Sequence, residues 1–314
     1  MILPKCEYTK AENIAHAIEL YESYNGQAHY LAGGTDLIPL VKLRLSTPAA
    51  IIDLKGIEEL KAISQQGNSL VIGANVTLFD LKNNDKVKEH FPVLSESLDK
   101  TSCETLQMRG TIGGNILQGT RCLLYNKSLE WRTAQGFCFK MGGETCNVVP
   151  NAKACFSNYC SDNALSLLAL SASVKLSGPK GEREMQLEEI FSGDGRNPFT
   201  LIPGEILTEL HIPMERSKGA YEKLRVRGSI DYPLLGVAIS VNDNSGKICV
   251  GAIGTTPLVY NLENVNDGTI KDIAQKAYNN AKPVANTTLS AGYRKKMVGV
   301  LIQRAMKKAL KEGE

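Results

Sequence analysis

Apolar residues recur along the first 55 residues in two patterns, one of helical spacing and one of short continuous runs. Helical spacing extends from Ala11 to Tyr24 and returns in Leu37–Leu45. The runs His29–Ala32 and Ala50–Leu54 have the length of strands, and a Gly-Gly pair follows the first of them. This order predicts a small α/β unit at the start of the chain.

The stretch from residue 56 to about 115 consists of shorter elements and ends in a second Gly-Gly turn. Its apolar runs are brief, which predicts strands and single helical pieces rather than one long helix. Strands are predicted at Ala62–Ser64, Ser69–Ile72 and Asn75–Thr77, and helices at Leu78–Lys82 and Val93–Lys100.

Regular spacing of apolar residues returns after Tyr159. A helical run at Asp162–Leu170 and a hairpin turn at Gly178–Gly181 precede a series of strands, and helices end the chain, the last at Ala291–Lys311. Strands followed by helices predict an α+β fold rather than a regular βαβ alternation. The strands are predicted at Ile206–Ile212, Tyr221–Arg227, Leu235–Val241 and Lys247–Ile253. The packed face of the last helix is predicted to consist of Met297, Val300, Leu301, Ala305 and Leu310.

The stretch at about 119–160, which we call the insert, has no apolar periodicity and contains four cysteines spaced C-x15-C-x7-C-x8-C. Such a stretch cannot build a hydrophobic core of its own. Four thiolates suit either a tetrahedral zinc ion or an iron–sulfur cluster. Structural zinc usually takes its cysteines in C-x2–4-C pairs, and none is present among these four, so the spacing favours a cluster. The four cysteines are Cys122, Cys138, Cys146 and Cys155.

The other cysteines leave alternatives open. Four unrelated thiols in a surface loop, or zinc, remain possible interpretations of the insert, and Cys160 could replace Cys155 as the fourth ligand. The isolated residues Cys6, Cys103 and Cys249 are predicted to be small core residues.

Two glycine turns resemble each other. Each follows a strand-like segment and precedes a helical one, the first at Ala32–Leu37 and the second at Thr111–Asn115. Glycines allow backbone N–H groups to converge on a phosphate, so two such turns suggest a diphosphate held from two sides. The alternative is a pair of ordinary tight turns with Thr35 or Asp36 as a helix cap. Neither turn matches G-x-G-x-x-G or G-x-x-x-x-G-K-[ST].

Composition narrows the class of protein. The chain of 314 residues is long enough for two or three domains, and its net charge of +3 gives no bulk attraction to nucleic acid or a membrane. The first residues lack the apolar core of a secretory signal, and no run approaches the roughly 18 apolar residues of a membrane span. These features predict a cytoplasmic protein whose eight cysteines stay reduced and serve metal binding or catalysis.

Four segments together resemble the FAD-binding medium subunit of molybdenum hydroxylases, the family of carbon monoxide dehydrogenase and xanthine dehydrogenase. The resemblance implies a two-part FAD-binding domain of the vanillyl-alcohol oxidase (PCMH) type at 1–177, with parts 1–55 and 56–177, and an α+β C-terminal domain at 178–314. The insert would then interrupt the FAD-binding domain. The segments are Ala32–Leu37, Gly110–Asn115, Gly204–Pro213 and Tyr221–Leu224.

The same resemblance implies which residues contact FAD. The two glycine turns would bind the diphosphate, Asp162 would contact the cofactor, and Lys223 and Tyr232 would flank the isoalloxazine. Without the resemblance, Tyr232 is equally well a half-buried strand residue. The residues implied in the turns are Ala32, Gly33, Gly34, Thr35, Asp36, Leu37, Thr111, Gly113, Gly114 and Asn115.

The insert resembles that of the beta subunit of 4-hydroxybenzoyl-CoA reductase, through its cysteine spacing and through Thr120-Arg121-Cys122, Tyr125-Asn126 and Trp131-Arg132. This resemblance implies a [4Fe-4S] cluster on the four cysteines, with Cys160 a bystander.

The implied function is an electron-transfer subunit without catalytic residues, in a reductase of anaerobic aromatic degradation. A ferredoxin-like donor would supply electrons through [4Fe-4S] and FAD to a small [2Fe-2S] subunit and a large molybdopterin subunit, in a dimer of heterotrimers. The alternatives are a xanthine- or aldehyde-type hydroxylase subunit that passes electrons outward, and a zinc-stapled flavoprotein without a catalytic role.

Overall fold

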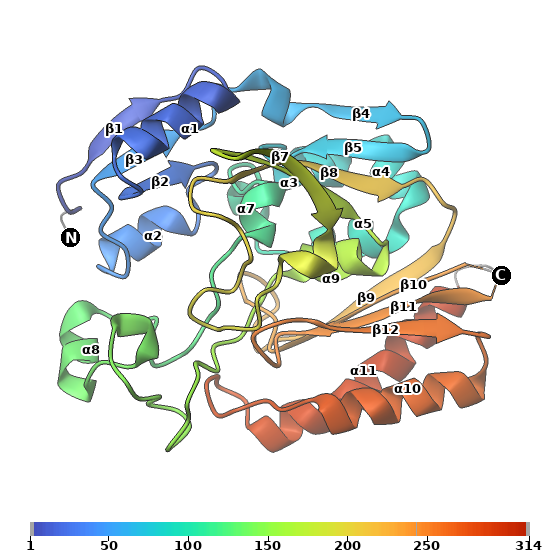
Figure 1. Ribbon diagram of the computed structural model, residues 1–314. Helices are drawn as coiled ribbons and strands as arrows, with labels where there is room; N and C mark the ends of the chain where they lie inside the picture. Colours follow the sequence, from blue (N-terminus) through green and yellow to red (C-terminus); the bar gives the residue numbers. More distant parts are fainter. Residues whose placement is uncertain (1–2, 243, 312–314) are drawn as a thin grey trace.

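The computed structural model describes residues 3–242 and 244–311, and Figure 1 shows three β-sheets with helices between and below them. The first sheet has the order β1-β3-β2, from β1 (Glu7–Lys10), β3 (Ala50–Asp53) and β2 (Ala28–Leu31), and all its strands are parallel. Parallel neighbours need crossover connections. The helix α1 (Ile14–Ser23) connects β1 to β2, and α2 (Leu37–Lys42) lies between β2 and β3. This confirms the predicted α/β unit.

The second sheet is antiparallel and combines distant parts of the sequence. Its order is β4-β5-β8-β6-β7, and the central strand β8 comes from beyond residue 200. The predicted domain boundary at 177/178 therefore lies inside the β6–β7 hairpin, and we propose a boundary after β8 instead. The strands are β4 (Ile63–Gln66), β5 (Ser69–Gly73), β6 (Ser173–Gly178), β7 (Gly181–Gln186) and β8 (Ile206–Pro213).

Short helices pack on the second sheet and enclose one large hydrophobic core. All eight residues of α9 (Asp162–Ala169) are buried, and this helix packs against α5 and against the third sheet. Asn75–Thr77 is not the predicted strand, because Thr77 caps α3 by accepting a hydrogen bond from the Asp80 N–H. The other elements are η1 (Glu58–Lys61), α3 (Leu78–Asn83), α4 (Asp85–His90), α5 (Pro92–Lys100), α6 (Glu104–Gln107), α7 (Ile112–Ile116) and η3 (Leu187–Ile190).

The third sheet is an antiparallel meander in the order β12-β11-β10-β9, and Figure 1 shows α10 and α11 below it. Two predicted face residues of α11 are wrong, because Val300 and Leu310 are 37% and 41% exposed. The buried stripe instead follows Val298, Ile302 and Met306 together with Leu301 and Ala305. These elements are β9 (Lys218–Leu224), β10 (Leu235–Val241), β11 (Ser245–Gly251), β12 (Leu258–Glu263), α10 (Asp267–Asn280) and α11 (Ala291–Lys311).

The insert lies apart from the sheets, at the lower left of Figure 1. Its two ends are joined by backbone hydrogen bonds in both directions between Arg121 and Asn158, at 2.7 and 2.8 Å. It contains the helix α8 (Leu129–Gln135), which was not predicted, and the short turn of helix η2 (Phe139–Met141). The insert is thus a closed loop that leaves the fold and returns at one point.

The remaining sequence-based expectations concern the isolated cysteines and the possibility of a membrane-spanning helix. Of the three isolated cysteines, Cys249 is buried as predicted, whereas Cys6 and Cys103 are only half-buried and are not core residues. No helix in the described part of the chain has the length and apolar character needed to cross a membrane.

Candidate functional site

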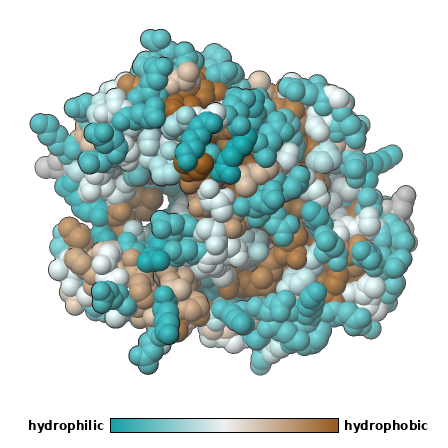
Figure 2. All heavy atoms as spheres, viewed as in Figure 1, coloured by the Kyte–Doolittle hydropathy of each residue, from teal (hydrophilic) through white to brown (hydrophobic). Residues whose placement is uncertain are grey.

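Both glycine turns line one cavity of about 300 Å³, which we call the first cavity. The first turn connects β2 to α2, whereas in the second Thr111 caps α7 and Gly113 and Gly114 lie within that helix. Figure 2 shows a hollow at the left of the molecule, between its upper part and the insert. All ten turn residues implied by the resemblance line this cavity: Ala32, Gly33, Gly34, Thr35, Asp36, Leu37, Thr111, Gly113, Gly114 and Asn115.

Glycine is required where these turns approach other backbone. A Cβ on Gly33 would collide with the Arg109 carbonyl oxygen of the second turn. A Cβ on Gly113 would lie 2.7 Å from the Ala74 Cβ and 2.9 Å from its carbonyl oxygen. The turns therefore contact their surroundings through backbone, which leaves room beside them for a bulky ligand group.

A second, smaller cavity of about 130 Å³ adjoins the first. Both are lined by Thr35, Asp36, Asn115 and Gln118. Gln118 is buried, and its side-chain oxygen Oε1 has no hydrogen-bond partner among the described residues, although its amide nitrogen donates to the Asn115 carbonyl at 2.8 Å. A buried acceptor without a donor costs free energy. Gln118, which sequence patterns did not identify, is thus suited to receive a donor from a ligand.

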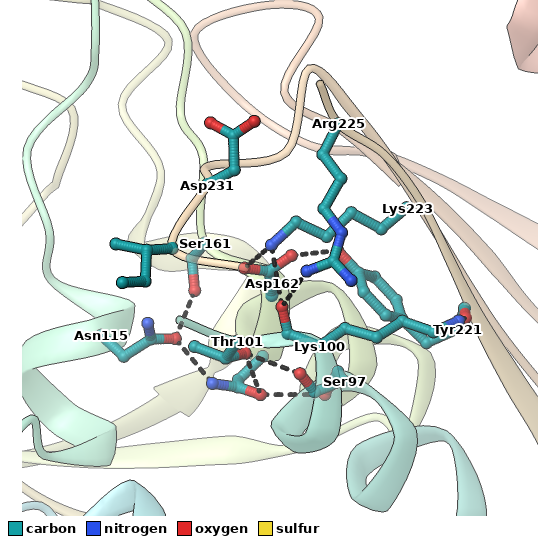
Figure 3. Close-up of polar contacts among 12 residues, drawn as sticks. Ser97, Lys100, Thr101, Asn115, Ser161, Asp162, Tyr221, Lys223, Arg225 and Asp231 are labelled. Carbon is teal, nitrogen blue, oxygen red and sulfur yellow. Dashed lines mark hydrogen bonds and ion pairs between the residues drawn. The ribbon is translucent and has the colours of Figure 1, made fainter. Parts of the chain in front are cut away.

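Asp162 lies at the start of the buried helix α9 and lines the second cavity (Figure 3). Its carboxylate accepts a hydrogen bond from the Tyr221 hydroxyl at 2.5 Å and one from Lys223 Nζ at 3.0 Å. Burial raises the pKa of Asp162, and the Lys223 ammonium opposes that shift. Burial also lowers the pKa of Lys223 itself. The two residues form a buried ion pair at the wall of the cavity.

Lys223 does not line either cavity and reaches the site only through Asp162. It also donates to the Lys100 carbonyl at 3.0 Å, which fixes its ammonium between α5 and α9. On the other side of α9, the Asn115 side-chain oxygen accepts from Ser161 Oγ at 2.8 Å and from Asn163 Nδ2 at 3.1 Å (Figure 3). These contacts tie the second glycine turn to α9.

Tyr232 lines the second cavity and contacts the first turn. Its hydroxyl donates to Asp36 Oδ1 at 3.0 Å, and the Arg121 guanidinium lies 4.4 Å from the centroid of its ring. Arg121 also forms an ion pair with Asp36. Asp36 makes no cap hydrogen bond to α2, so the helix-cap alternative does not apply to it. Arg121 was not predicted as a residue of this site. In the sequence, only its position directly before Cys122 pointed to it.

The four insert cysteines line one cavity, which we call the cysteine cavity. Cys160 is not part of it and instead lines the second cavity. All four thiols are free of disulfides. No three His, Cys, Asp or Glu side chains of residues 3–242 and 244–311 are arranged to hold a single metal ion. The arrangement therefore brings four thiols around a common space without a preformed one-ion geometry.

Tight turns position these cysteines. The Cys122 carbonyl accepts from the Tyr125 and Asn126 N–H groups at 3.1 and 3.0 Å, and the Cys138 carbonyl accepts from the Gly143 N–H at 3.0 Å. Burial raises the pKa of Cys122, while the Leu124 and Tyr125 N–H groups oppose this shift by hydrogen bonding to the sulfur. Backbone N–H groups directed at sulfur stabilise a thiolate, the form that binds metals.

The residues that line these cavities can be compared with two kinds of ligand, a flavin dinucleotide and a metal centre. The glycine-lined cavities and the unpaired Gln118 acceptor fit an elongated ligand with phosphates at one end and ring N–H or hydroxyl donors at the other, as in a flavin dinucleotide. The four thiols are a donor set that suits either an iron–sulfur cluster or one tetrahedral ion.

Residues 4–215 match the family model described as "FAD binding domain in molybdopterin dehydrogenase". The carbon monoxide dehydrogenase medium chain of Afipia carboxidovorans is 30% identical over 324 residues, covering 98% of each chain. The aldehyde oxidoreductase FAD-binding subunit PaoB of Escherichia coli is 29% identical over 297 residues, covering 90% of this chain and 92% of that one.

The fold has a solved counterpart of similar size. A chain of the reconstituted CO dehydrogenase from Oligotropha carboxidovorans superposes with a TM-score of 0.80 at 26% identity, and the match covers 98% of this chain and 99% of the other. A chain of quinoline 2-oxidoreductase from Pseudomonas putida 86 gives a TM-score of 0.77 at 21% identity, which indicates a shared fold.

Proposed function

Because the chain belongs to the family of FAD-binding domains in molybdopterin dehydrogenases, we propose that it is the flavin-binding electron-transfer subunit of a molybdenum hydroxylase-type complex. The chain is an oxidoreductase subunit, and its relatives of known name are subunits of oxidoreductases. One observation carries the assignment of the cofactor. Two glycine turns almost 80 residues apart in sequence line a single cavity.

FAD supplies one- and two-electron redox chemistry when bound, and the residues of this chain place it. The first glycine turn would hold the diphosphate through backbone N–H groups, with Thr35, Thr111 and Asn115 as polar side chains beside it. The second turn would offer a glycine surface, because its Gly113 and Gly114 N–H groups already donate to the Ala74 carbonyl and to Thr111 Oγ1. The second cavity would receive the flavin end. There Asp162 and Tyr232 line the wall, and Lys223 acts as a positioning residue through its ion pair with Asp162.

We further propose that the insert holds a [4Fe-4S] cluster on Cys122, Cys138, Cys146 and Cys155. The convergence of all four thiols on one cavity supports this proposal. The same four thiols would also suit the zinc-stapled alternative, which metal analysis distinguishes. Cys160 is placed on the flavin side and is a bystander to the cluster in this proposal.

Two directions of electron flow are compatible with this subunit. The named relatives support the hydroxylase-type alternative, in which the subunit passes electrons outward to an acceptor, better than a 4-hydroxybenzoyl-CoA reductase. The cysteine cavity supports a second candidate function, a reductase in which a ferredoxin-like donor delivers electrons at the insert. In both, the substrate chemistry lies on a partner subunit.

The proposed partners follow from the same family. We propose a large molybdopterin subunit and a small [2Fe-2S] subunit, assembled with this chain as a dimer of heterotrimers in the cytoplasm. The relative from Afipia carboxidovorans is named a medium chain, which supports a complex of several subunits.

Metal and flavin analysis of the anaerobically purified full-length chain tests these proposals. FAD with about four irons per chain supports the flavin and cluster assignments together. FAD without metal favours the hydroxylase-type subunit without an additional cluster, and zinc favours the stapled flavoprotein. The absence of bound FAD under saturating cofactor would contradict the main proposal. Reduction of the holoenzyme by its aromatic or aldehyde substrate, as opposed to reduction by reduced ferredoxin, then distinguishes the two directions.

A further inference from the structure

A lysine side chain forms part of the wall of the cysteine cavity. Lys140 lies in η2, two residues after Cys138, and lines the cavity together with the four cysteines. Its Nζ donates to the Thr120 carbonyl at 3.0 Å and to Thr120 Oγ1 at 2.8 Å. It also lies 4.6 Å from the centroid of the Tyr125 ring. These contacts hold the ammonium in one place at the base of the insert.

The charge of Lys140 has no carboxylate to balance it. Across residues 3–242 and 244–311, this side chain forms no ion pair with Asp or Glu. Lys140 lines the cavity together with Cys122, Cys138, Cys146 and Cys155, so the thiols are the groups next to it that can carry negative charge. A desolvated cation is costly unless an anion is close to it. The anion that fits this place is the thiolate ligand set itself.

A hydroxyl chain extends from Lys140 to one of the sulfurs. Thr120 Oγ1 accepts from Lys140, donates to the Gly195 carbonyl at 2.6 Å, and lies 2.7 Å from Ser157 Oγ. Ser157 Oγ is in turn 3.0 Å from Cys155 Sγ. Ser157 Oγ also donates to the Gly195 carbonyl at 3.0 Å, so the carbonyl and a Cys155 thiolate, the stronger acceptor, share its one hydroxyl hydrogen. Lys140 and Ser157 are thus linked through Thr120 on the Cys155 side of the cavity.

We propose that Lys140 is the counter-charge of a cluster in the cysteine cavity and that it raises the reduction potential of that cluster. The inference rests on the proposed cluster and adds a positioning residue to it. Reduction adds one electron, and therefore one negative charge, to an already anionic centre. A fixed cation stabilises the reduced form more than the oxidised form, because the Coulomb energy grows with the charge. Net charge and hydrogen bonds to sulfur are known determinants of cluster potential.

The test is an EPR-monitored reductive titration of the anaerobically purified full-length chain, with dithionite as the reductant. In Lys140→Met, we expect the reduction equilibrium to move about tenfold toward the oxidised cluster, which is about 59 mV for one electron. Lys140→Arg should keep the wild-type potential because it keeps the charge. Lys127→Met is the matched control, since Lys127 belongs to the insert but does not line the cavity.

The outcomes separate the two proposals. A wild-type chain without iron overturns the cluster itself. An iron-loaded Lys140→Met variant with an unchanged potential, or an equal shift in Lys127→Met, overturns only the role of Lys140. If Lys140→Met does not assemble a cluster, iron retained in Lys140→Arg supports the counter-charge. Iron lost from both variants overturns it, because the shape of the lysine rather than its charge is then required.

Discussion

Arg121 of the insert forms an ion pair with Asp36 of the first glycine turn, although 85 residues separate them in sequence. Arg121 directly precedes Cys122, so one residue connects the cysteine cavity to the cavity lined by the glycine turns. Its guanidinium also lies over the Tyr232 ring. The insert is therefore attached to the proposed flavin site by side chains as well as by the backbone.

Replacing Arg121 should weaken FAD binding. In Arg121→Gln, Asp36 keeps its negative charge but loses its cation, and the carboxylate then repels the FAD diphosphate. Hydrogen bonds to charged groups contribute about 1.5–3 kcal/mol, so we expect the dissociation constant of FAD to rise by roughly tenfold or more. Fluorescence titration of the FAD-depleted chain measures this change.

The control for Arg121→Gln is Arg304→Gln, the same substitution at an exposed position of α11. It should leave the affinity for FAD unchanged. Equal affinities in wild type and Arg121→Gln would show that the insert does not contribute to the flavin site.

Gln118 provides a test of the cavity that does not depend on charge. Gln118→Leu removes the buried, unpaired acceptor Oε1 of a residue that lines both cavities and keeps the volume of the side chain nearly constant. We expect weaker FAD binding, by about 1 kcal/mol or roughly fivefold in the dissociation constant, because a ligand donor loses its acceptor. The unfolding free energy of the FAD-free chain should fall by about 0.5–1.5 kcal/mol, because the hydrogen bond from the Gln118 amide nitrogen to the Asn115 carbonyl is also lost, so affinities are compared between folded proteins.

Gln107 is the matched control for Gln118. It is also a buried glutamine with an unpaired Oε1, but its amide nitrogen donates to the Leu98 and Thr101 carbonyls and it lines neither cavity. Gln107→Leu should therefore lower the unfolding free energy and leave the affinity of the remaining folded protein for FAD unchanged. The opposite result, with Gln107 governing affinity, would place the flavin elsewhere.

Glu205 should make the stability of the chain depend on pH. Its carboxylate accepts from Arg183 Nε at 2.7 Å, from Arg183 Nη2 at 2.8 Å and from the Ile202 N–H at 2.7 Å. Burial acts to raise the pKa of Glu205, but these donors outweigh it and hold the pKa below its ordinary value of 4.5. A depressed pKa contributes stability above 4.5 that is lost as the pH falls further.

The variant Glu205→Gln isolates this contribution. At pH 7 its unfolding free energy should be about 1.5–3 kcal/mol lower than that of the wild type, and the difference should shrink as the pH falls below 4.5. Urea unfolding at several pH values measures both effects. Glu58→Gln is the control, because the Glu58 side chain is 83% exposed beside Lys61 and should change stability by less than about 1 kcal/mol. A difference for Glu205→Gln that stays constant with pH would exclude its charge as the cause.

The sequence located short local signals well. The glycine pairs are adjacent residues, and the four cysteines lie within one short stretch of the sequence. Their chemistry depends on residue type, so they could be recognised without a fold. Most helices and buried strands also followed from apolar spacing. The strand β1 was missed because three of its four residues are exposed and it carries no apolar run.

What depends on distant contacts could not be predicted from spacing. The strand β8 pairs with β5 across more than 130 residues and with β6 across 29 to 38 residues, which moves the proposed domain boundary. Arg121 and Lys140 are ordinary basic residues in the sequence, and only the folded insert places one on Asp36 and the other beside the thiols. Their roles arise from the way the loop closes at Arg121 and Asn158.

The separation between the cysteine cavity and the flavin cavities leads to the last prediction. Cys138 lines only the cysteine cavity, whereas Cys160 lines only the second cavity. Cys138→Ser should therefore lose the cluster while the purified chain keeps its FAD, because the glycine turns bind it without contributions from Cys138. Cys160→Ser should keep about four irons per chain. Iron and FAD are quantified in the same anaerobic preparation.

The link through Arg121 makes this last prediction discriminating. If the insert unfolds when the cluster is lost, Arg121 leaves Asp36 and Tyr232, and Cys138→Ser should then bind FAD as weakly as Arg121→Gln does. If the insert keeps its shape, FAD affinity stays at the wild-type level, since the backbone hydrogen bonds between Arg121 and Asn158 hold Arg121 in place. Complete loss of FAD, beyond the effect of Arg121→Gln, would contradict both, because the insert would then be an integral part of the flavin site.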